Sequence, residues 1–484
     1  MANNTKTKVV SGFFWRFAER VGAQLVAFVV SVVLARLLEP SMYGTIALIT
    51  VFTTILQTFV DSGLGTALIQ KKDADDLDFS TVFYTNIVFC SVLYLLMFFG
   101  APFIAKFYKD DTLTPLVRVL SLTIVISGVK GVQQAYVSKK MIFKRFFFAT
   151  LGGTLTAAAI GIWMAYHGYG VWALVAQQLI NLTIDTIILW ITVKWRPKKM
   201  FSFKRLKGLY SFGWKMLVSA LLEKVYNDVR QLIIGRMYSP ADLAYYNRAK
   251  QFPTLVVNNI NTSIDSVLLP AMASAQDSRE HVKSMTRRAI MTSTCIMSPL
   301  RIGLAFMSTP VIRLILTEKW LPCVPFMVIF CITYMFRPVH TANLNAIKAL
   351  GRSDIFLTLE IIKRVVGVAV LLATMWFGVM AMAYSLLFVT VSSQIINSWP
   401  NKKLLNYSYL EQLKDILPGM ALAAFMGVCI YPIQFIGLPD IVTILIQVPL
   451  GAAIYIAGSK LFKLEAFGFV WDTAKPMLEK FKKK

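Results

Sequence analysis

The sequence predicts an all-α polytopic membrane protein, and three observations support this fold class. Of its 484 residues, 56% are hydrophobic and only 15% are charged, and the mean hydropathy is +0.61. Such a composition lies far from that of a soluble domain. Apolar runs long enough for the roughly 20 residues that a helix needs to cross a bilayer recur along the whole chain. Basic residues, finally, are concentrated in alternate loops between these runs.

We count fourteen candidate transmembrane segments. In chain order they cover residues 11–35, 43–69, 80–105, 114–137, 146–166, 169–193, 210–237, 250–273, 287–316, 322–348, 355–377, 379–400, 412–434 and 439–462. The segments within 146–193 and within 355–400 are separated by only a few residues. Each of these two pairs is therefore expected to form a helical hairpin.

Orientation is predicted from the loops, because basic residues in short loops stay in the cytoplasm. With the N-terminus inside, the inner loops hold many basic residues, among them Lys139, Lys140, Lys144, Arg145, Lys194, Arg196, Lys198 and Lys199. The outer loops hold few. Both termini are therefore expected in the cytoplasm, with the lysine-rich C-terminal end against the anionic inner leaflet. This asymmetry accounts for much of the +25 net charge without nucleic acid.

A motif recurs in the two halves of the chain. Arg36 and Pro40 in LARLLEPSMYG return as Arg236 and Pro240 in IGRMYSPADLA, and the DS of VDSGLG returns in IDSVLL. Each arginine is expected to end a helix on the outer side, where a cation favours the helix dipole, and each proline to stop that helix. Six predicted crossings separate the two copies. An even number gives two halves with the same orientation, which is the arrangement of parallel transporter repeats.

Three regions follow from this repeat. Residues 1–209 are expected to form an N-terminal lobe of six helices, and residues 210–401 a C-terminal lobe of six more. Residues 402–484 would add helices thirteen and fourteen and a basic cytoplasmic tail. Two such lobes around a central cavity place a substrate site near the midplane, and rocking of one lobe against the other exposes that site to each side in turn.

A resemblance to a known family is carried by LARLLEPSMYG, DSGLGTALIQ, the second-half FGW, GRMYSPADLAYYNRAKQFP and NTSIDSVLLPAMA. In their order and spacing, these stretches resemble the polysaccharide transporter family of the multidrug, oligosaccharidyl-lipid and polysaccharide flippase superfamily. The chain is most similar to the colanic-acid and teichuronic-acid exporter branch, from about Ser11 to about Ser459. The resemblance implies movement of undecaprenyl-pyrophosphate-linked sugar units from the cytoplasmic to the outer leaflet of the bacterial cytoplasmic membrane.

Ionisable residues inside the spans are the candidate site residues, since each costs about 2.5–3.5 kcal/mol at a helix centre. A pyrophosphate or a uronate must leave water with its charge, and Arg or Lys in a low-dielectric cavity supplies charge-assisted hydrogen bonds. Six cations are expected to line such a cationic cavity: Arg16, Arg20, Lys224, Arg230, Arg301 and Arg337. For each of them a structural ion pair is the alternative, as between Lys224 and Asp228.

Four carboxylates are candidates for ion coupling: Asp61, Glu223, Asp228 and Asp265. A buried acid can exchange a proton or a sodium ion between the two faces of the membrane. For Asp61 and Asp265, helix capping or pairing with a cytoplasmic lysine explains the position equally well. No cofactor and no metal site are predicted, because the five cysteines lie in apolar segments without metal-ligand spacing.

Three other functions compete with the flippase. A multidrug exporter of the same superfamily would favour an acidic, aromatic cavity, whereas a peptidoglycan-precursor flippase shares the cationic one. A membrane glycosyltransferase or polymerase needs an extended loop carrying acids or histidines, and the longest loop here is short and basic. For this reason an enzyme is not expected. There is also no GxxxxGK phosphate loop, so direct ATP hydrolysis by this chain is not expected either. Expected partners are the lipid-linked oligosaccharide, membrane lipids, a polysaccharide polymerase and glycosyltransferases.

Overall fold

The computed structural model describes residues 2–61, 63–471 and 475, and nearly all of them are helical. Within these ranges, the side chains of residues 2–14, 16–18, 20, 61, 212, 255–260 and 262–266 are not described. The chain divides into two compact units, Met1–Ala244 and Tyr245–Lys484. The lobes expected at 1–209 and 210–401, and the C-terminal region 402–484, stay predictions.

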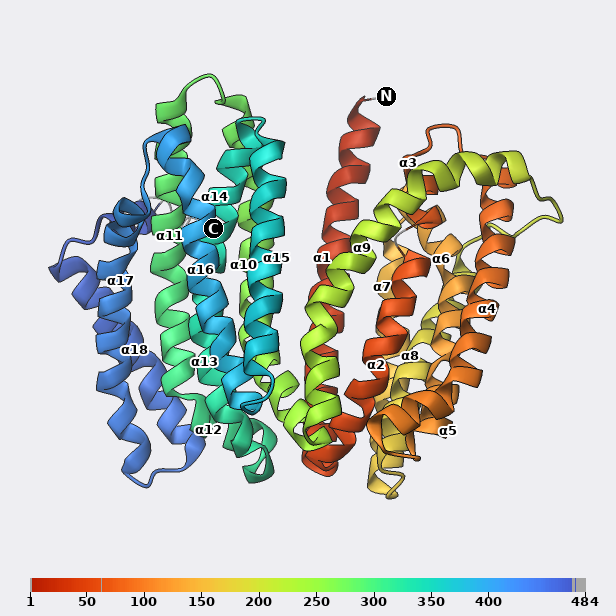
Figure 1. Ribbon diagram of the computed structural model, residues 1–484, viewed down its shortest axis with the longest axis horizontal. Coiled ribbons are helices and arrows are strands. Elements are labelled where there is room, and N and C mark those ends of the chain that lie inside the picture. The colour runs from red at the N-terminus through yellow and green to blue at the C-terminus, as the bar shows by residue number, and fades with distance from the viewer. Residues whose placement is uncertain (1, 62, 472–474, 476–484) are drawn as a thin grey trace. The chain divides into compact units, whose positions relative to one another are not determined.

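The first unit contains nine helices among its described residues (Figure 1). They are α1 (Ala2–Leu37), α2 (Pro40–Asp61), α3 (Leu64–Gln70), α4 (Asp76–Tyr108), α5 (Leu113–Leu120), α6 (Leu122–Lys140), α7 (Lys144–Tyr166), α8 (Val171–Thr192) and α9 (Phe203–Met237). A cluster of buried apolar side chains from α3, α4, α6, α7 and α8, centred on Leu68, Val82, Val132 and Leu189, forms the core of this unit.

The second unit begins within α10 (Pro240–Ser274), whose first turn belongs to the first unit. It continues through α11 (Arg279–Phe306), α12 (Ser308–Leu316), the 3₁₀ helix η1 (Glu318–Cys323), α13 (Val324–Met335), α14 (Arg337–Ala349), α15 (Ser353–Thr374), α16 (Val379–Leu405), α17 (Tyr409–Ile430), the 3₁₀ helix η2 (Tyr431–Phe435) and α18 (Asp440–Leu461). A buried amide network joins three of its helices: Asn343 of α14 binds Gln412 of α17 at 2.8 Å and Asn401 of α16 at 2.7 Å.

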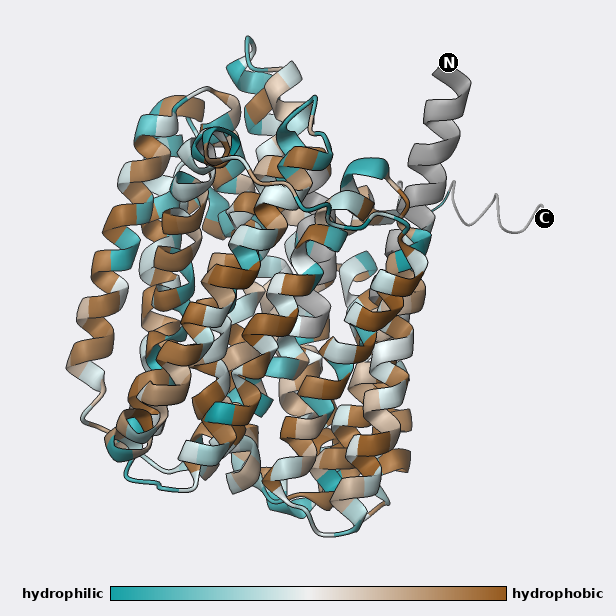
Figure 2. Ribbon diagram, turned by 90° about the vertical axis from the view of Figure 1, so that its right-hand side faces the viewer, coloured by the Kyte–Doolittle hydropathy of each residue, from teal (hydrophilic) through white to brown (hydrophobic). Residues whose placement is uncertain are grey.

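The helices have the composition of a membrane protein. In the described part of the chain, ten stretches are long and apolar enough to cross a bilayer. Figure 2 shows hydrophobic residues along the lengths of the helices and hydrophilic ones gathered at their ends. The all-α polytopic class predicted from sequence is therefore confirmed. The count of fourteen spans is not confirmed. Helices α9, α10 and α15 are long but carry too many charged or polar residues to be counted on composition, and the described apolar part of α1, Val21–Leu37, is too short.

Four predicted spans are broken in the structure. The run 43–69 is divided into α2 and α3, 114–137 into α5 and α6, 287–316 into α11 and α12, and 322–348 into η1, α13 and α14. Proline explains the last break, since Pro338 has no N–H to continue the helix of α13 and stands in the first turn of α14 instead. Hydropathy cannot reveal such breaks, because both sides of each are apolar.

Both predicted hairpins are confirmed. Helices α7 and α8 pack along each other, as do α15 and α16 (Figure 1). The turn between α7 and α8 contains Gly168 and Gly170 at φ 78° and 54°, and that between α15 and α16 contains Gly378 at φ 98°. Glycine adopts such angles without steric cost, which is why each connection can be only a few residues long.

The repeated motif forms two helix corners that touch. Helix α1 ends at Leu37 and α2 begins at Pro40, while α9 ends at Met237 and α10 begins at Pro240. Each proline thus occupies the first position of the next helix, where its missing N–H is not needed. The first corner packs against the second through Gly44, because a Cβ at Gly44 would lie 1.7 Å from the carbonyl oxygen of Pro240.

Replacing Gly44 with alanine is expected to destabilise the first unit by about 3 kcal/mol. The added methyl group meets rigid backbone, so the two corners must separate. Thermal unfolding in detergent measures the effect. Gly100→Ala is the matched control, because a Cβ at this helical glycine meets nothing within 4 Å. Equal unfolding temperatures for the two variants would show that the corners separate without cost.

Candidate functional site

Helix α9 carries the first group of predicted site residues. Lys224 Nζ lies 2.9 Å from Asp228 Oδ2, and Gln231 Nε2 donates to Asp228 Oδ1 at 3.0 Å. Their i, i+4 and i+7 spacing brings them together on one face of the helix. Glu223 is exposed, whereas Asp228 and Arg230 are buried. The ion pair that was the alternative for Lys224 is therefore formed, and it neutralises part of the expected cationic surface.

Arg301 lies near the end of α11 and is only 1% exposed. Its Nε, Nη1 and Nη2 atoms form no hydrogen bond within the described structure. The polar neighbours of the guanidinium are on α13: Cys331, whose sulfur is a weak acceptor, and Tyr334. A buried guanidinium without a carboxylate is costly. This cation is consequently the predicted site residue whose structural setting most needs a functional explanation.

Arg337 is the first residue of α14, and its side chain is exposed. The sequence placed both Arg301 and Arg337 near the centres of their spans. This placement is wrong for Arg301, which lies near the end of α11, whereas Arg337 starts α14 but lies near the middle of the apolar stretch Glu318–Ala349. The breaks after Phe306 and at Phe336 put Arg301 close to a helix end and Arg337 at a helix start.

Four predicted site residues cannot be placed. The side chains of Arg16, Arg20, Asp61 and Asp265 lie outside the described residues. Their proposed roles therefore stay predictions.

A polar pocket of about 580 Å³ lies inside the first unit among α1, α2, α3, α6, α7 and α8. Its charged lining residues are Glu19, Lys130 and Asp185. Lys130 Nζ lies 2.5 Å from Asp185 Oδ2, and the two side chains are 12% and 11% exposed. The second carboxylate oxygen, Asp185 Oδ1, is buried and accepts no hydrogen bond from the described atoms.

Close helix packing positions the charges of the polar pocket. A Cβ at Gly153 of α7 would lie 2.6 Å from the Asn181 carbonyl oxygen and 3.1 Å from the Asp185 Cβ of α8. Only glycine lets α8 approach α7 this closely and so brings Asp185 toward Lys130 of α6. On the opposite side, Thr150 Oγ1 donates to Glu19 Oε1 at 3.3 Å, which ties α1 to α7.

Among its described lining residues, the polar pocket contains two carboxylates and one ammonium group. Attraction between charges is strong where surrounding helices lower the dielectric constant. The unpaired Asp185 oxygen can accept a proton or a small cation. The sequence did not lead us to this pocket, although Asp185 is the only acidic residue in the apolar run 171–193. That isolated acid was the available signal.

The packed apolar helices with few buried charges define a multi-pass helical membrane protein. The same fold is seen in the lipid II flippase MurJ in its inward closed conformation, with a TM-score of 0.77, 15% identity, and coverage of 93% of this chain and 98% of that chain.

A family profile described as "Polysaccharide biosynthesis protein" matches residues 33–325. This match covers more than half of the chain, and the chain belongs to that family.

Two curated relatives agree with this membership. The teichuronic acid biosynthesis protein TuaB of Bacillus subtilis is 26% identical over 394 residues, covering 79% of this chain and 80% of its own length. The lipopolysaccharide biosynthesis protein WzxC of Escherichia coli is 21% identical over 434 residues, covering 87% and 88%. The resemblance drawn from the repeated motif is confirmed. The protein is a polysaccharide-biosynthesis transporter of the flippase and exporter type, and not an enzyme.

Proposed function

We propose that this transporter moves undecaprenyl-pyrophosphate-linked oligosaccharide from the inner to the outer leaflet of the bacterial cytoplasmic membrane by alternating access. The family match over residues 33–325 carries the proposal. Relatives named for teichuronic acid and lipopolysaccharide biosynthesis, aligned over most of their length, support it. Both termini are proposed to lie in the cytoplasm, and a polymerase and glycosyltransferases of the same pathway are the proposed partners.

The headgroup is proposed to contact the cations predicted from sequence: Arg16, Arg20, Lys224, Arg230, Arg301 and Arg337. Arg301 has the strongest physical case, because a buried guanidinium without a carboxylate can form charge-assisted bonds with phosphate oxygens. Lys224 has a weaker case, since Asp228 already binds it. A phosphate would have to compete with that carboxylate, or the pair would have to open during transport.

Coupling to a proton or sodium gradient is proposed to use buried carboxylates. Asp61, Glu223, Asp228 and Asp265 were the candidates from sequence. Asp185 joins them, because it combines burial, a cationic partner and an oxygen without a hydrogen bond in the polar pocket. Binding of a proton to this oxygen would remove the charge that holds Lys130. The ammonium group would then be released toward the pocket, so ion binding and the packing of α6 against α8 would change together.

The proposal predicts that purified protein moves a labelled polyprenyl-pyrophosphate oligosaccharide across proteoliposome membranes. Arg337→Ala is expected to lower the initial rate about tenfold, and Lys224→Ala by less, because Lys224 is already paired. Leaflet accessibility of the labelled sugar is the measurement. Lys403→Ala is the control, since this lysine is exposed at the end of α16.

Each contrary result has a distinct meaning. If folded protein moved no lipid-linked sugar but exported organic cations, it would be a multidrug exporter. Selective movement of a peptidoglycan precursor would instead assign it to that flippase class. If both Arg337→Ala and Lys224→Ala still transported the lipid-linked sugar at the normal rate, the proposed function would stand, but these two residues would not contact the headgroup.

A further inference from the structure

The first turns of α9 separate two cavities in the first unit. On one side is a basic cavity of about 650 Å³, lined by Lys71 of α3 and by Lys204 and Arg205 of α9. On the other side is an apolar groove of about 600 Å³, between α9, the end of α2, the start of α3 and the first half of α4. Neither cavity takes part in the transport site described above.

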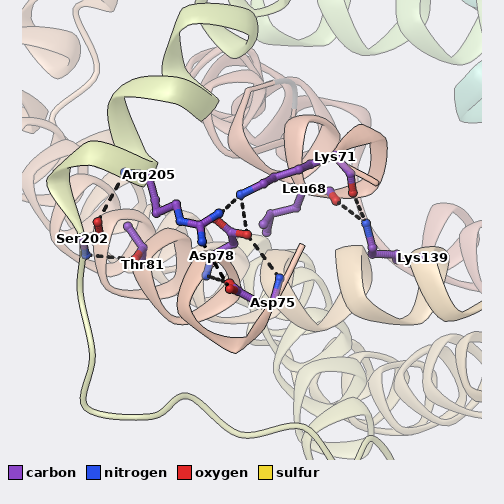
Figure 3. A network of polar contacts seen from close by, with 8 residues as sticks. All are labelled: Leu68, Lys71, Asp75, Asp78, Thr81, Lys139, Ser202 and Arg205. Carbon is purple, nitrogen blue, oxygen red and sulfur yellow. Dashed lines mark hydrogen bonds and ion pairs between the residues drawn. The ribbon is translucent and has the colours of Figure 1, made fainter. Parts of the chain in front are cut away.

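The basic cavity is built on a fixed network of ion pairs (Figure 3). Lys71 Nζ lies 2.6 Å from the fully buried carboxylate of Asp78, and Arg205 reaches Asp75 at 3.5 Å and Asp78 at 3.8 Å. Asp75 also accepts the Asp78 N–H at 3.0 Å, and this hydrogen bond is the main reason that the pKa of Asp75 is lowered. Lys139 donates to the carbonyl oxygens of Leu68 and Lys71.

This network leaves positive charge in excess. Asp75 and Asp78 balance Lys71 and Arg205. Among the described contacts, neither Lys204 nor Lys207 has an ion-pair partner. The segment 194–207 contains seven basic residues and no acidic one. A basic segment at the edge of a span attracts anionic lipid headgroups.

The apolar groove has the character of a membrane interface. Phe203, Tyr210 and Trp214 of α9 line it, together with Phe89 of α4, and these four side chains are 79%, 56%, 44% and 39% exposed. Tyrosine and tryptophan favour the boundary between headgroups and acyl chains. Lys207 lines the groove as well, so a cation accompanies an otherwise apolar surface.

We infer that the start of α9 is a binding site for an anionic phospholipid of the surrounding bilayer. One acyl chain occupies the apolar groove, and the phosphate binds Lys204 and Lys207. Charge complementarity selects this occupant. A soluble anion would leave the groove empty, and a zwitterionic lipid would bring a second positive charge to a region that already has an excess. The site is distinct from that of the transported substrate and does not depend on the proposed function.

Quenching of tryptophan fluorescence by brominated acyl chains tests this site. The full-length protein is reconstituted with brominated phosphatidylglycerol or brominated phosphatidylcholine at equal mole fractions. The signal of Trp214 is isolated as the difference between the intact protein and Trp214→Phe. We expect brominated phosphatidylglycerol to quench the fluorescence of Trp214 about fivefold more effectively than brominated phosphatidylcholine does. Trp376, which lies just after the end of α15, is 70% exposed and has no lysine or arginine within ten residues on either side in the sequence. Isolated in the same way, it is the control and should respond equally to both lipids.

The double variant Lys204→Gln/Lys207→Gln is expected to lose the preference and to keep the quenching by phosphatidylcholine. Both lysines are exposed, so folding should be retained. Equal quenching of Trp214 by the two lipids in the intact protein, or a preference unchanged in the double variant, would overturn the inference. Displacement of brominated phosphatidylglycerol by equimolar polyprenyl pyrophosphate would assign the groove to the lipid carrier instead. Absence of displacement supports the phospholipid.

Discussion

Arg301→Met is expected to raise the unfolding temperature of the protein and to abolish transport. The guanidinium of Arg301 is 1% exposed, and its three nitrogens form no hydrogen bond within the described structure. Methionine fills a similar space without a charge. Replacing buried ionic groups with apolar ones of similar volume is neutral or stabilising by about 1–4 kcal/mol. Because Arg301 lowers the stability of the fold, its role must be functional, and phosphate binding is the role that we propose.

The same substitution at Arg287 is the matched control. Arg287 lies on the same helix but binds Asp415 through Nε and Nη2 at 2.9 Å each, and Glu465 at 2.9 Å. Arg287→Met should therefore lower the unfolding temperature. Differential scanning fluorimetry measures the unfolding temperature of each variant, and the proteoliposome assay measures its transport. Together they distinguish a functional role of Arg301 from the structural role of Arg287. If Arg301→Met unfolded at a lower temperature than the intact protein, Arg301 would be a structural residue and its role in transport would lose its physical basis.

Local patterns in the sequence predicted much of the fold. The hairpins α7–α8 and α15–α16 and the corners at Pro40 and Pro240 depend on short connections with glycine or proline, whose effect on the backbone is local. Contacts within one helix were predictable for the same reason. Lys224 and Asp228 are four residues apart, and their pairing follows from helix geometry alone.

Features that depend on distant residues were not predictable in this way. Lys130 and Asp185 are on different helices, and only the packing of α6, α7 and α8 brings them together. The breaks at Ser121 and Phe336 lie within apolar runs, so hydropathy shows no change there. The unpaired state of Arg301 also required the structure, because a sequence can show that a charge is in a span but not which groups surround it.

Asp185→Asn is expected to destabilise the first unit by about 3 kcal/mol and to abolish transport. Removing one partner of a buried ion pair leaves the other charge uncompensated, at a cost of about 3–5 kcal/mol. The lower end of this range is expected here, because Glu19 and the hydroxyl and amide groups of the polar pocket can still interact with the Lys130 ammonium group. Lys130→Met alone should destabilise as well, because it leaves the Asp185 carboxylate buried with neither of its oxygens paired.

The double variant Lys130→Met/Asp185→Asn separates structure from coupling. With both charges gone, the unfolding temperature should return toward that of the intact protein. If the pair serves only packing, transport should return as well. The coupling proposal expects the opposite: a stable protein whose transport rate no longer responds to an imposed proton or sodium gradient. Thermal unfolding and gradient-driven transport measured on the same preparations decide between these outcomes, and a fully active double variant would remove Asp185 from the coupling candidates.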